Sequence, residues 1–226
     1  MGPTEKALSE APGGVACAGD ACSRGLLQRI MSTSPIVIVL AAGRGTRFTG
    51  SGHKLQQSLV RNSVLGTTLD SVRASCLPMV VVTTEALEAE VARHVSTRDT
   101  VVLPPVLAQQ GMARSIAAGV SARPQASGWL ILPGDMPLIR PDTLHRVADA
   151  LPGHACVVPF HQGRRGHPVG FSAELYSELM ALSGDEGARR LLMRYPSCEV
   201  HVDDPGVLLD IDTQEDLDKA RERAAS

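Results

Sequence analysis

The stretch IVIVLAAGRGTRFT, residues 36–49, decides the fold that this chain is expected to adopt. Five apolar residues, 36–40, continue through two alanines into Gly43. A short β-branched run that ends at glycine is typical of a strand buried on both faces, as in a parallel sheet covered by helices. The glycines then allow the backbone to approach a ligand, and Arg47 and Lys54 indicate that this ligand is an anion such as a phosphate chain.

This loop matches neither of two common phosphate-binding patterns. The Walker pattern GxxxxGK[ST] needs a lysine after its second glycine, but the frame from Gly45 to Gly50 is followed by Ser51. The dinucleotide pattern GxGxxG begins well with Gly43 and Gly45 but meets Phe48 where the third glycine belongs. Taken alone, the stretch also fits an ordinary strand and turn with two solvated arginines.

A third pattern, LAAGxGxRF…K, does fit the stretch. It resembles the opening signature of the nucleotidyltransferases that join an NTP to a phosphorylated acceptor, and its LAAG form is similar to the molybdenum cofactor cytidylyltransferase branch. The resemblance implies nucleotide-binding roles here for Leu40, Ala41, Ala42, Gly43, Gly45, Arg47 and Lys54. It also implies that Arg47 and Lys54 stabilise charge as pyrophosphate leaves.

The rest of the chain alternates strand and helix patterns. Helical spacing over residues 64–72 and 85–95 separates apolar strand patterns at 79–83 and 101–103. This rhythm predicts crossover connections and a parallel sheet. The expected fold class is a single-domain, Rossmann-like α/β/α structure of three layers with a mostly parallel sheet, as in the nucleotide-diphospho-sugar transferases.

A helix is predicted for residues 111–120, with Met112, Ile116 and Val120 on one face. Simple packing accounts for such a stripe. The segment nevertheless resembles the family's GMxxS element, which borders the nucleotide, and this implies that Ser115 contacts it.

The stretch WLILPGDMP, residues 129–137, predicts a further apolar strand that is followed by a carboxylate, Asp135. Ligands of open α/β sheets bind beyond the carboxyl ends of strands, and a carboxylate there can hold Mg²⁺. Asp135 could equally cap a turn before Pro137. The pattern LxxDMPxI is similar to the family's metal-binding motif, which implies a catalytic, nucleotide-binding and metal-binding role for Asp135.

The loop GRRGHPVGF, residues 163–171, fits either an anion site or a solvated charged turn. Together with the later pattern GDxGAR, it resembles segments that line the acceptor side in the same branch. The resemblance implies that Arg165 and His167 hold the phosphate or ring of the pterin and that Asp185 hydrogen-bonds to it. Ser172 is expected to cap the helix that follows.

A last strand is predicted at residues 207–211, and it delivers Asp210 and Asp212 to a turn. Thr213 then begins a helix whose acidic first turn and basic later turns match the helix dipole, so capping explains much of this segment. The family uses a carboxylate here as its second metal ligand. We prefer Asp210 to Asp212 because Asp212 lies closer to the cap.

Composition limits the remaining possibilities. The 226 residues, 43% of them hydrophobic, suffice for one core, and a net charge of −2 argues against a nucleic-acid coat. Five cysteines without a CxxC pair indicate reduced thiols in the cytoplasm. No membrane span or secretory signal is evident. Residues 1–34 are expected to form a disordered extension and residues 35–226 the nucleotidyltransferase domain.

The resemblance as a whole implies a Mg²⁺-dependent transfer of CMP from CTP to molybdopterin with release of pyrophosphate. A molybdoenzyme or its chaperone is a further candidate partner. A guanylyl- or sugar-phosphate nucleotidyltransferase and a non-catalytic module that carries the cofactor remain as alternatives. One departure concerns the acceptor: the chain continues from Lys54 as LQQSLVRNSV, without the Gly-Lys-Pro turn that is usual in the family.

Overall fold

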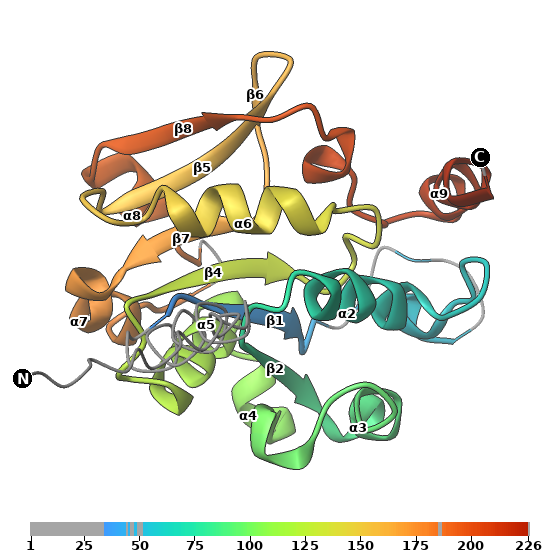
Figure 1. The fold of residues 1–226 in the computed structure, drawn as a ribbon. Helices are drawn as coiled ribbons and strands as arrows, with labels where there is room; N and C mark the ends of the chain where they lie inside the picture. The colour runs from blue at the N-terminus through green and yellow to red at the C-terminus, as the bar shows by residue number, and fades with distance from the viewer. Residues whose placement is uncertain (1–33, 44, 46–47, 49–51, 185–186, 226) are drawn as a thin grey trace, which may run out of the picture. The chain divides into compact units, whose positions relative to one another are not determined.

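The computed structural model describes residues 34–43, 45, 48, 52–184 and 187–225 (Figure 1). The predicted roles of Arg47 and Asp185, and the predicted extension up to residue 33, lie outside these described residues. The expected domain boundary near residue 34 therefore stays a prediction.

A mixed sheet of eight strands lies at the centre of the described chain, in the order β3-β2-β1-β4-β7-β5-β6 with β8 added beside β5. The first four of these strands are parallel: β1 Ile36–Ala41, β2 Met79–Thr84, β3 Thr100–Leu103 and β4 Gly128–Pro133. In the register, Val39 lies between Val81 and Leu132. The continuous apolar runs of β1, β2 and β4 are thus central strands, buried as the sequence predicts, whereas β3 is an edge strand of the sheet.

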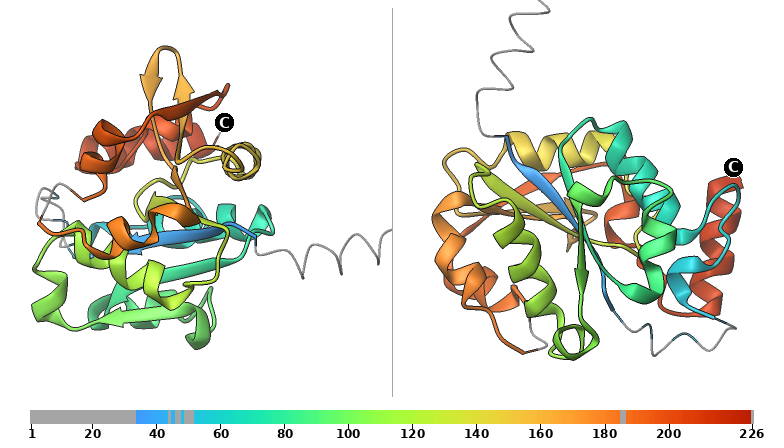
Figure 2. Two further views of the ribbon diagram at one scale, coloured as in Figure 1. Left: turned by 90° about the vertical axis from the view of Figure 1, so that its left-hand side faces the viewer. Right: turned by 90° about the horizontal axis from the view of Figure 1, so that it is seen from below.

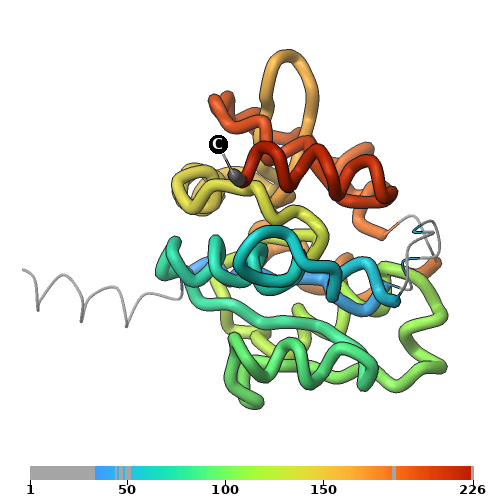
Figure 3. Tube along the Cα trace, turned by 90° about the vertical axis from the view of Figure 1, so that its right-hand side faces the viewer, coloured from blue at the N-terminus to red at the C-terminus, as the bar shows by residue number. Residues whose placement is uncertain are grey.

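The other half of the sheet contains strands of both directions. β7, Val169–Ser172, runs antiparallel to its neighbours β4 and β5, Cys156–His161. β8, Ser197–His201, is parallel to β5, and the short β6, Arg164–Arg165, folds back on β5 as a hairpin. This hairpin projects away from the neighbouring elements (Figure 1, Figure 3).

Helices cover both faces of the sheet, as the views in Figure 2 show for α5 and α6. Val37 and Val39 share one core cluster with the apolar side chains of α2, α3, α6 and α9, which span Val64–Ala74, Glu85–Val91, Pro141–Asp149 and Gln214–Ala225. Ile36 and Ile38 share the opposite cluster with α5, α7 and α8, which span Met112–Ala122, Tyr176–Met180 and Arg189–Arg194. The predicted three-layer α/β/α fold is confirmed.

Short elements complete the described chain: α4 Pro105–Ala108 and the 3-10 helices η1 Lys54–Gln56, η2 Thr97–Asp99, η3 Ala173–Leu175 and η4 Pro205–Leu208. Across the described residues, no helix combines the length and the apolar character that a membrane span requires.

The strand predicted at residues 207–211 is wrong. Its first half belongs to η4, because the Asp204 carboxylate accepts the backbone N–H of Gly206 at 2.9 Å and starts a helical turn at Pro205. The C-terminal strand of the sheet is β8 instead, a half-exposed strand whose sequence SCEVH carries a weak apolar pattern.

The prediction that the Ser172 side chain caps the following helix is wrong. Ser172 precedes η3, but its side chain makes no capping bond and its buried Oγ has no partner. The helix predicted to reach residue 95 ends at Val91.

Candidate active site

The carboxyl ends of β1 and β4 bring two loops together at one edge of the sheet. Leu40 pairs with Pro133, and the N–H of Gly134 donates to the Leu40 carbonyl at 2.9 Å. A Cβ on Gly134 would lie 3.0 Å from that carbonyl oxygen, so glycine permits this close approach. The loop after β1 and the loop that carries Asp135 therefore face the same space.

That space is a cleft of about 780 Å³. Its lining includes most of the residues that the motifs single out: Leu40, Ala42, Gly43, Gly45, Lys54, Ser115, Asp135, Arg165, His167 and Asp210. Ala41 does not line the cleft, because its side chain is fully buried in the core cluster of β1. Arg164 and Asp212, which lie within the motifs but are not among the predicted site residues, also line the cleft, as does Gln109, which no motif indicates.

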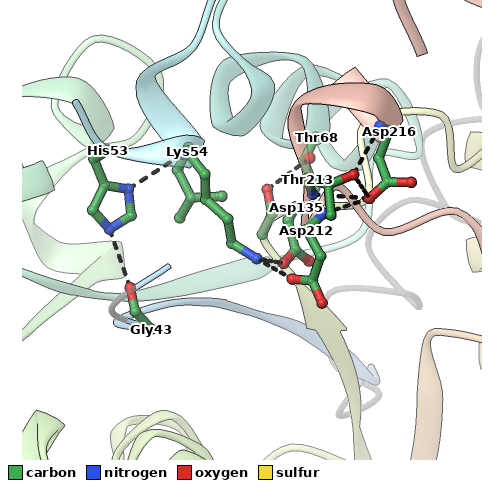
Figure 4. Close-up of polar contacts among 10 residues, drawn as sticks. Gly43, His53, Lys54, Thr68, Asp135, Asp212, Thr213 and Asp216 are labelled. Carbon is green, nitrogen blue, oxygen red and sulfur yellow. Dashed lines mark hydrogen bonds and ion pairs between the residues drawn. The ribbon is translucent and has the colours of Figure 1, made fainter. Parts of the chain in front are cut away.

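Lys54 connects two acidic side chains at the base of the cleft (Figure 4). Its Nζ lies 2.6 Å from Asp135 Oδ2 and 2.8 Å from Asp212 Oδ1. Burial lowers the pKa of Lys54, but the charge of Asp135 and the hydrogen bonds to both carboxylates outweigh burial and hold the pKa above its ordinary value. Lys54 is therefore a cation at neutral pH.

Backbone contacts fix Asp135 in this position. The N–H of Ile211 donates to the Asp135 carbonyl at 3.0 Å, which joins the C-terminal segment directly to the end of β4. The hydroxyl of Thr68 on α2 donates to the carbonyl of Gly134 at 3.0 Å. These contacts hold Asp135 beside Asp212, although the two acids lie far apart in the sequence.

The donor atoms suit a hard cation. Within the part of the chain that the structure describes, Asp135 Oδ1 is buried and has no hydrogen-bond partner, although Oδ2 contacts Lys54. An orphaned carboxylate oxygen is a ready ligand for Mg²⁺, which takes few protein ligands and shares its remaining positions with phosphate and water. Within the described ranges, no three His, Cys, Asp or Glu side chains cluster as a complete metal site.

The second acid at the base of the cleft is Asp212. The sequence argument prefers Asp210 because Asp212 adjoins the helix cap, but Thr213 and Asp216 form that cap. Asp216 accepts the N–H of Thr213 at 2.8 Å, and the Thr213 hydroxyl accepts the N–H of Asp216 at 3.1 Å. The Asp212 carboxylate is thus left to contact Lys54, while Asp210 lines the cleft and acts by its charge on His167.

His53 is a site residue that sequence reasoning missed. Its Nδ1 accepts the N–H of Leu55 at 3.2 Å, so its Nε2 carries the proton and donates to the Gly43 carbonyl at 3.1 Å. Burial lowers the pKa of His53; the hydrogen bond to Gly43 opposes this shift, and the charge of Lys54 adds to it. A histidine directly before the motif lysine is the signal that could have drawn attention to it.

Two glycines shape the loop beside Lys54. Gly45 has a φ of +59°, and a Cβ there would lie 3.1 Å from Lys54 Cγ. A Cβ on Gly43 would meet no atom of the described residues within 4 Å. The loop is therefore packed against the lysine at one glycine and open toward the cleft at the other.

The start of α5 forms another part of the cleft wall. Ile116 and Val120 are buried, as predicted, but Met112 is 49% exposed and contributes to the lining instead of the core. Ser115 is buried and lines the cleft one turn into the helix, where the motif predicts a nucleotide contact.

The predicted acceptor residues lie on the segment from β6 to β7. Arg165 pairs with Glu199 of β8 at 3.3 Å, and both side chains are exposed. The backbone N–H of His167 donates to the Val207 carbonyl at 2.9 Å, and the side-chain Nδ1 is buried with no hydrogen-bond partner in the described ranges. Burial lowers the pKa of His167, although the charges of Asp135 and Asp210 and a backbone hydrogen bond to Ile131 act in the opposite direction.

Comparisons of sequence agree with this geometry. A family profile described as MobA-like NTP transferase domain matches residues 37–199. Molybdenum cofactor cytidylyltransferase of Escherichia coli K12 is 24% identical over 186 residues, which make up 82% of this chain and 95% of that protein. Bifunctional protein GlmU of Corynebacterium aurimucosum is 28% identical over 162 residues, 65% of this chain, and the match spans only 31% of GlmU.

Solved structures are similar as well. The crystal structure of Rv0371c from Mycobacterium tuberculosis H37Rv superposes with a TM-score of 0.73 and 32% sequence identity, covering 84% of this chain and 99% of that one. A second structure of Rv0371c, a complex with manganese, gives a TM-score of 0.70 at 30% identity over the same shares of the two chains.

Proposed function

Because the chain belongs to the family of MobA-like NTP transferase domains and is a nucleotidyltransferase, we propose that it transfers CMP from CTP to molybdopterin with release of pyrophosphate, and that it uses Mg²⁺. The observation that carries this proposal is the convergence of the glycine loop, Lys54, Asp135 and Asp212 on one cleft. Similarity to the Escherichia coli cytidylyltransferase over 95% of its length supports CTP and molybdopterin as the substrates.

The proposed reaction needs alignment more than acid–base catalysis. A phosphate oxygen of the acceptor attacks the α-phosphorus of CTP, a new P–O bond forms, and the bond to the β-phosphate bridging oxygen breaks so that pyrophosphate leaves. A phosphate monoester is already anionic at neutral pH, so no general base has to remove a proton. The protein therefore has to orient the two substrates and neutralise their charge.

Each part of the cleft has a role in this proposal. Lys54 and Arg47, together with N–H groups of the glycine loop, neutralise charge on the leaving pyrophosphate. Asp135, with Asp212 or Asp210, is proposed to hold Mg²⁺, which supplies further positive charge to the triphosphate when it is bound. The manganese complex of Rv0371c supports a divalent ion in a protein of similar fold.

The acceptor side of the proposal rests on different residues. His167 and Arg165 on the segment from β6 to β7 are proposed to hold the phosphate or ring of the pterin, with Asp185. Arg164, which is exposed and also lines the cleft, is a further candidate for the acceptor phosphate. The exposed pair between Arg165 and Glu199 is weak enough to open for a ligand.

The domain boundary and the cellular location belong to the same proposal. We infer that the catalytic domain begins near residue 35, because β1 begins at Ile36 and the family match at residue 37. We infer a cytoplasmic location from the cysteines, since the described Cys76, Cys156 and Cys198 are all free thiols.

Release of pyrophosphate provides the test. The protein is mixed with Mg²⁺, molybdopterin or a sugar 1-phosphate, and CTP, GTP, UTP or ATP in turn. We expect the fastest release from CTP with molybdopterin, and at least about a hundredfold loss in Asp135→Asn, as for removal of a group that stabilises charge in the transition state. Asp149→Asn, at an exposed position of α6, is the matched control.

The outcomes separate the alternatives. Faster turnover of GTP, or of a sugar phosphate, would replace the proposed substrates while leaving the reaction type intact. Tight binding of the cofactor without pyrophosphate from any NTP, and delivery unaffected by Asp135→Asn, would contradict the proposal in favour of a carrier module.

A further inference from the structure

Lys54 lies where a cation between the two acids of the cleft would lie. One ammonium nitrogen contacts Asp135 Oδ2 at 2.6 Å and Asp212 Oδ1 at 2.8 Å, so these two oxygens cannot be farther apart than the sum of the distances. The side chains of Lys54 and Asp135 are only 11% and 16% exposed, and that of Asp212 is 29% exposed. Solvent therefore screens the contact between Lys54 and Asp135 least, and the charges of the three groups depend on one another.

We propose that Lys54 is an internal counter-ion that competes with the divalent cation for Asp135 and Asp212, so that the metal binds tightly only after nucleotide phosphates draw Lys54 away. This inference rests on the proposed function, because it concerns the same metal and the same triphosphate. It assigns an order to their binding: the cation arrives with the nucleotide, and in the free enzyme the single positive charge of Lys54 offsets part of the negative charge of the two acids.

Electrostatics supports the competition. Two carboxylates near one another repel, and burial raises the cost of both charges, so the pair is stable only with a cation between them. A metal ion that entered alone would have to break two charge-assisted hydrogen bonds and would leave the ammonium beside a doubly charged ion. Triphosphate oxygens remove this difficulty because they offer the ammonium a new anionic partner.

The local structure allows the lysine to move. Lysine carries its charge on a flexible four-carbon stem with rotatable donors, and only its Nζ contacts the acids. Gly45 lies against the stem and has no Cβ to trap it. The backbone of Lys54 is held separately, because the carbonyl of Lys54 accepts the N–H of Gln57 at 3.2 Å within η1.

The acids also retain a place for the metal while lysine is present. Asp135 Oδ1 stays buried and has no hydrogen-bond partner among the described residues, so the ammonium satisfies only one oxygen of this carboxylate. Oδ1 of Asp135 is therefore available to a metal ion, while Lys54 occupies Oδ2.

The test measures Mn²⁺ binding without nucleotide, by paramagnetic resonance of the free ion. Lys54→Met is expected to bind Mn²⁺ at least about tenfold more tightly than the wild type, because a buried charge that opposes the metal is gone. Lys54→Arg keeps the charge and is expected to stay close to the wild type. Lys219→Met removes an equally charged but exposed side chain of α9 and controls for net charge. Circular dichroism verifies that each variant is folded.

A second arm adds CTP. CTP is expected to increase the Mn²⁺ affinity of the wild type at least about tenfold more than that of Lys54→Met, since only the wild type has a lysine to displace. Equal or weaker Mn²⁺ binding by Lys54→Met without nucleotide would overturn the inference. If Asp135→Asn still abolished Mn²⁺-dependent CTP binding, the proposed function would survive that failure. Absence of Mn²⁺ binding in every variant, with or without CTP, would overturn both.

Discussion

At the scale of single residues, the cleft depends on side chains that hold backbone groups in place. His53 joins the Gly43 carbonyl to the N–H of Leu55 and so connects the glycine loop to the turn that carries Lys54. Lys54 and Asp135 follow from sequence motifs, because a glycine loop and a carboxylate at a strand end have recognisable patterns. The contact between Lys54 and Asp212 does not, because it depends on where a long side chain points in the folded protein.

His53 predicts a pH dependence of nucleotide binding. Its neutral form is the one that accepts from Leu55, and burial lowers its pKa, so the neutral form persists below the ordinary value of 6.5. As pH falls through this lowered pKa, protonation of Nδ1 breaks the bond to Leu55. Calorimetry is expected to show CTP affinity declining in this acidic range.

The variant His53→Asn separates this effect from titration of CTP itself. Asparagine keeps an oxygen that can accept from Leu55, cannot reach Gly43 in the same way, and does not titrate. We expect roughly threefold to tenfold weaker CTP binding at pH 7.5, as for one lost hydrogen bond, and a smaller loss on acidification. An acid-induced loss as large as that of the wild type would show that another group is responsible.

Gly45 gives a second prediction at this scale. In Gly45→Ala, the left-handed φ of +59° is strained and the new Cβ presses on Lys54 Cγ at 3.1 Å. Gly153→Ala has a similar strain at a φ of +84°, with no atom within 4 Å. Both are expected to lose about 1 kcal/mol of unfolding free energy in urea titrations. Only Gly45→Ala is expected to weaken CTP binding, by at least about fivefold; equal binding by the two variants would remove Gly45 from the site.

At the scale of elements, the segment between β8 and α9 places Asp210 and Asp212, and local sequence describes it poorly. The apolar run at residues 207–209 favours a strand prediction, but Asp204 and Pro205 set a 3-10 turn that no strand can include. Thr213 and Asp216 then cap α9, as the sequence predicts, since a capping box is a purely local pattern. Local sequence therefore predicts the start of α9, whereas tertiary contacts determine the structure of the segment before it.

Asp204 is the anchor of this segment. Its buried carboxylate accepts the N–H of Arg140 at 3.0 Å, the hydroxyl of Thr143 at 2.7 Å and the N–H of Gly206 at 2.9 Å. Asp204→Ala leaves these donors unpaired and is expected to cost about 3 kcal/mol of unfolding free energy. It should also reduce CTP turnover, because Asp210 and Asp212 lose their support.

The neighbouring Asp203→Ala is a matched control, since the Asp203 side chain is exposed and only its backbone carbonyl contacts Arg140. Its stability is expected to remain within about 0.5 kcal/mol of the wild type. A similar loss of stability in both variants would mean that the three hydrogen bonds of the buried Asp204 carboxylate are not what stabilises this turn.

At the scale of the whole molecule, the parallel half of the sheet can be predicted and the mixed half cannot. The strands β1, β2 and β4 carry continuous apolar runs, which indicate burial on both faces. The insertion of β7 between β4 and β5, and the pairing of β8 with β5, depend on which strands meet across the sheet. Periodicity shows that a strand exists but does not identify its neighbours, so the motif that contains Arg165 and His167 could be found in the sequence, whereas its place beside the cleft follows from the fold.

Protonation couples to the stability of the whole molecule through His167. Burial lowers the pKa of His167 in the folded protein, so the unfolded chain binds more protons around pH 6. Its contribution to stability is fully present above pH 6.5 and is lost as pH falls through the lowered pKa. Urea unfolding at pH 7.5 and pH 5.5 is expected to show a loss for the wild type that is smaller in His167→Gln; an equal loss in both would assign the effect elsewhere.

The central claim is that Asp135 and its partner acid bind a divalent ion that carries a triphosphate, over the glycine loop. Calorimetric titration of CTP with Mg²⁺ and with EDTA, in the wild type and in Asp135→Asn, tests it most directly. We predict that CTP binds the wild type at least about tenfold more tightly with Mg²⁺ than with EDTA, and that Asp135→Asn shows no such difference. CTP binding that is equally tight in EDTA, or a full Mg²⁺ effect in Asp135→Asn, would contradict the account.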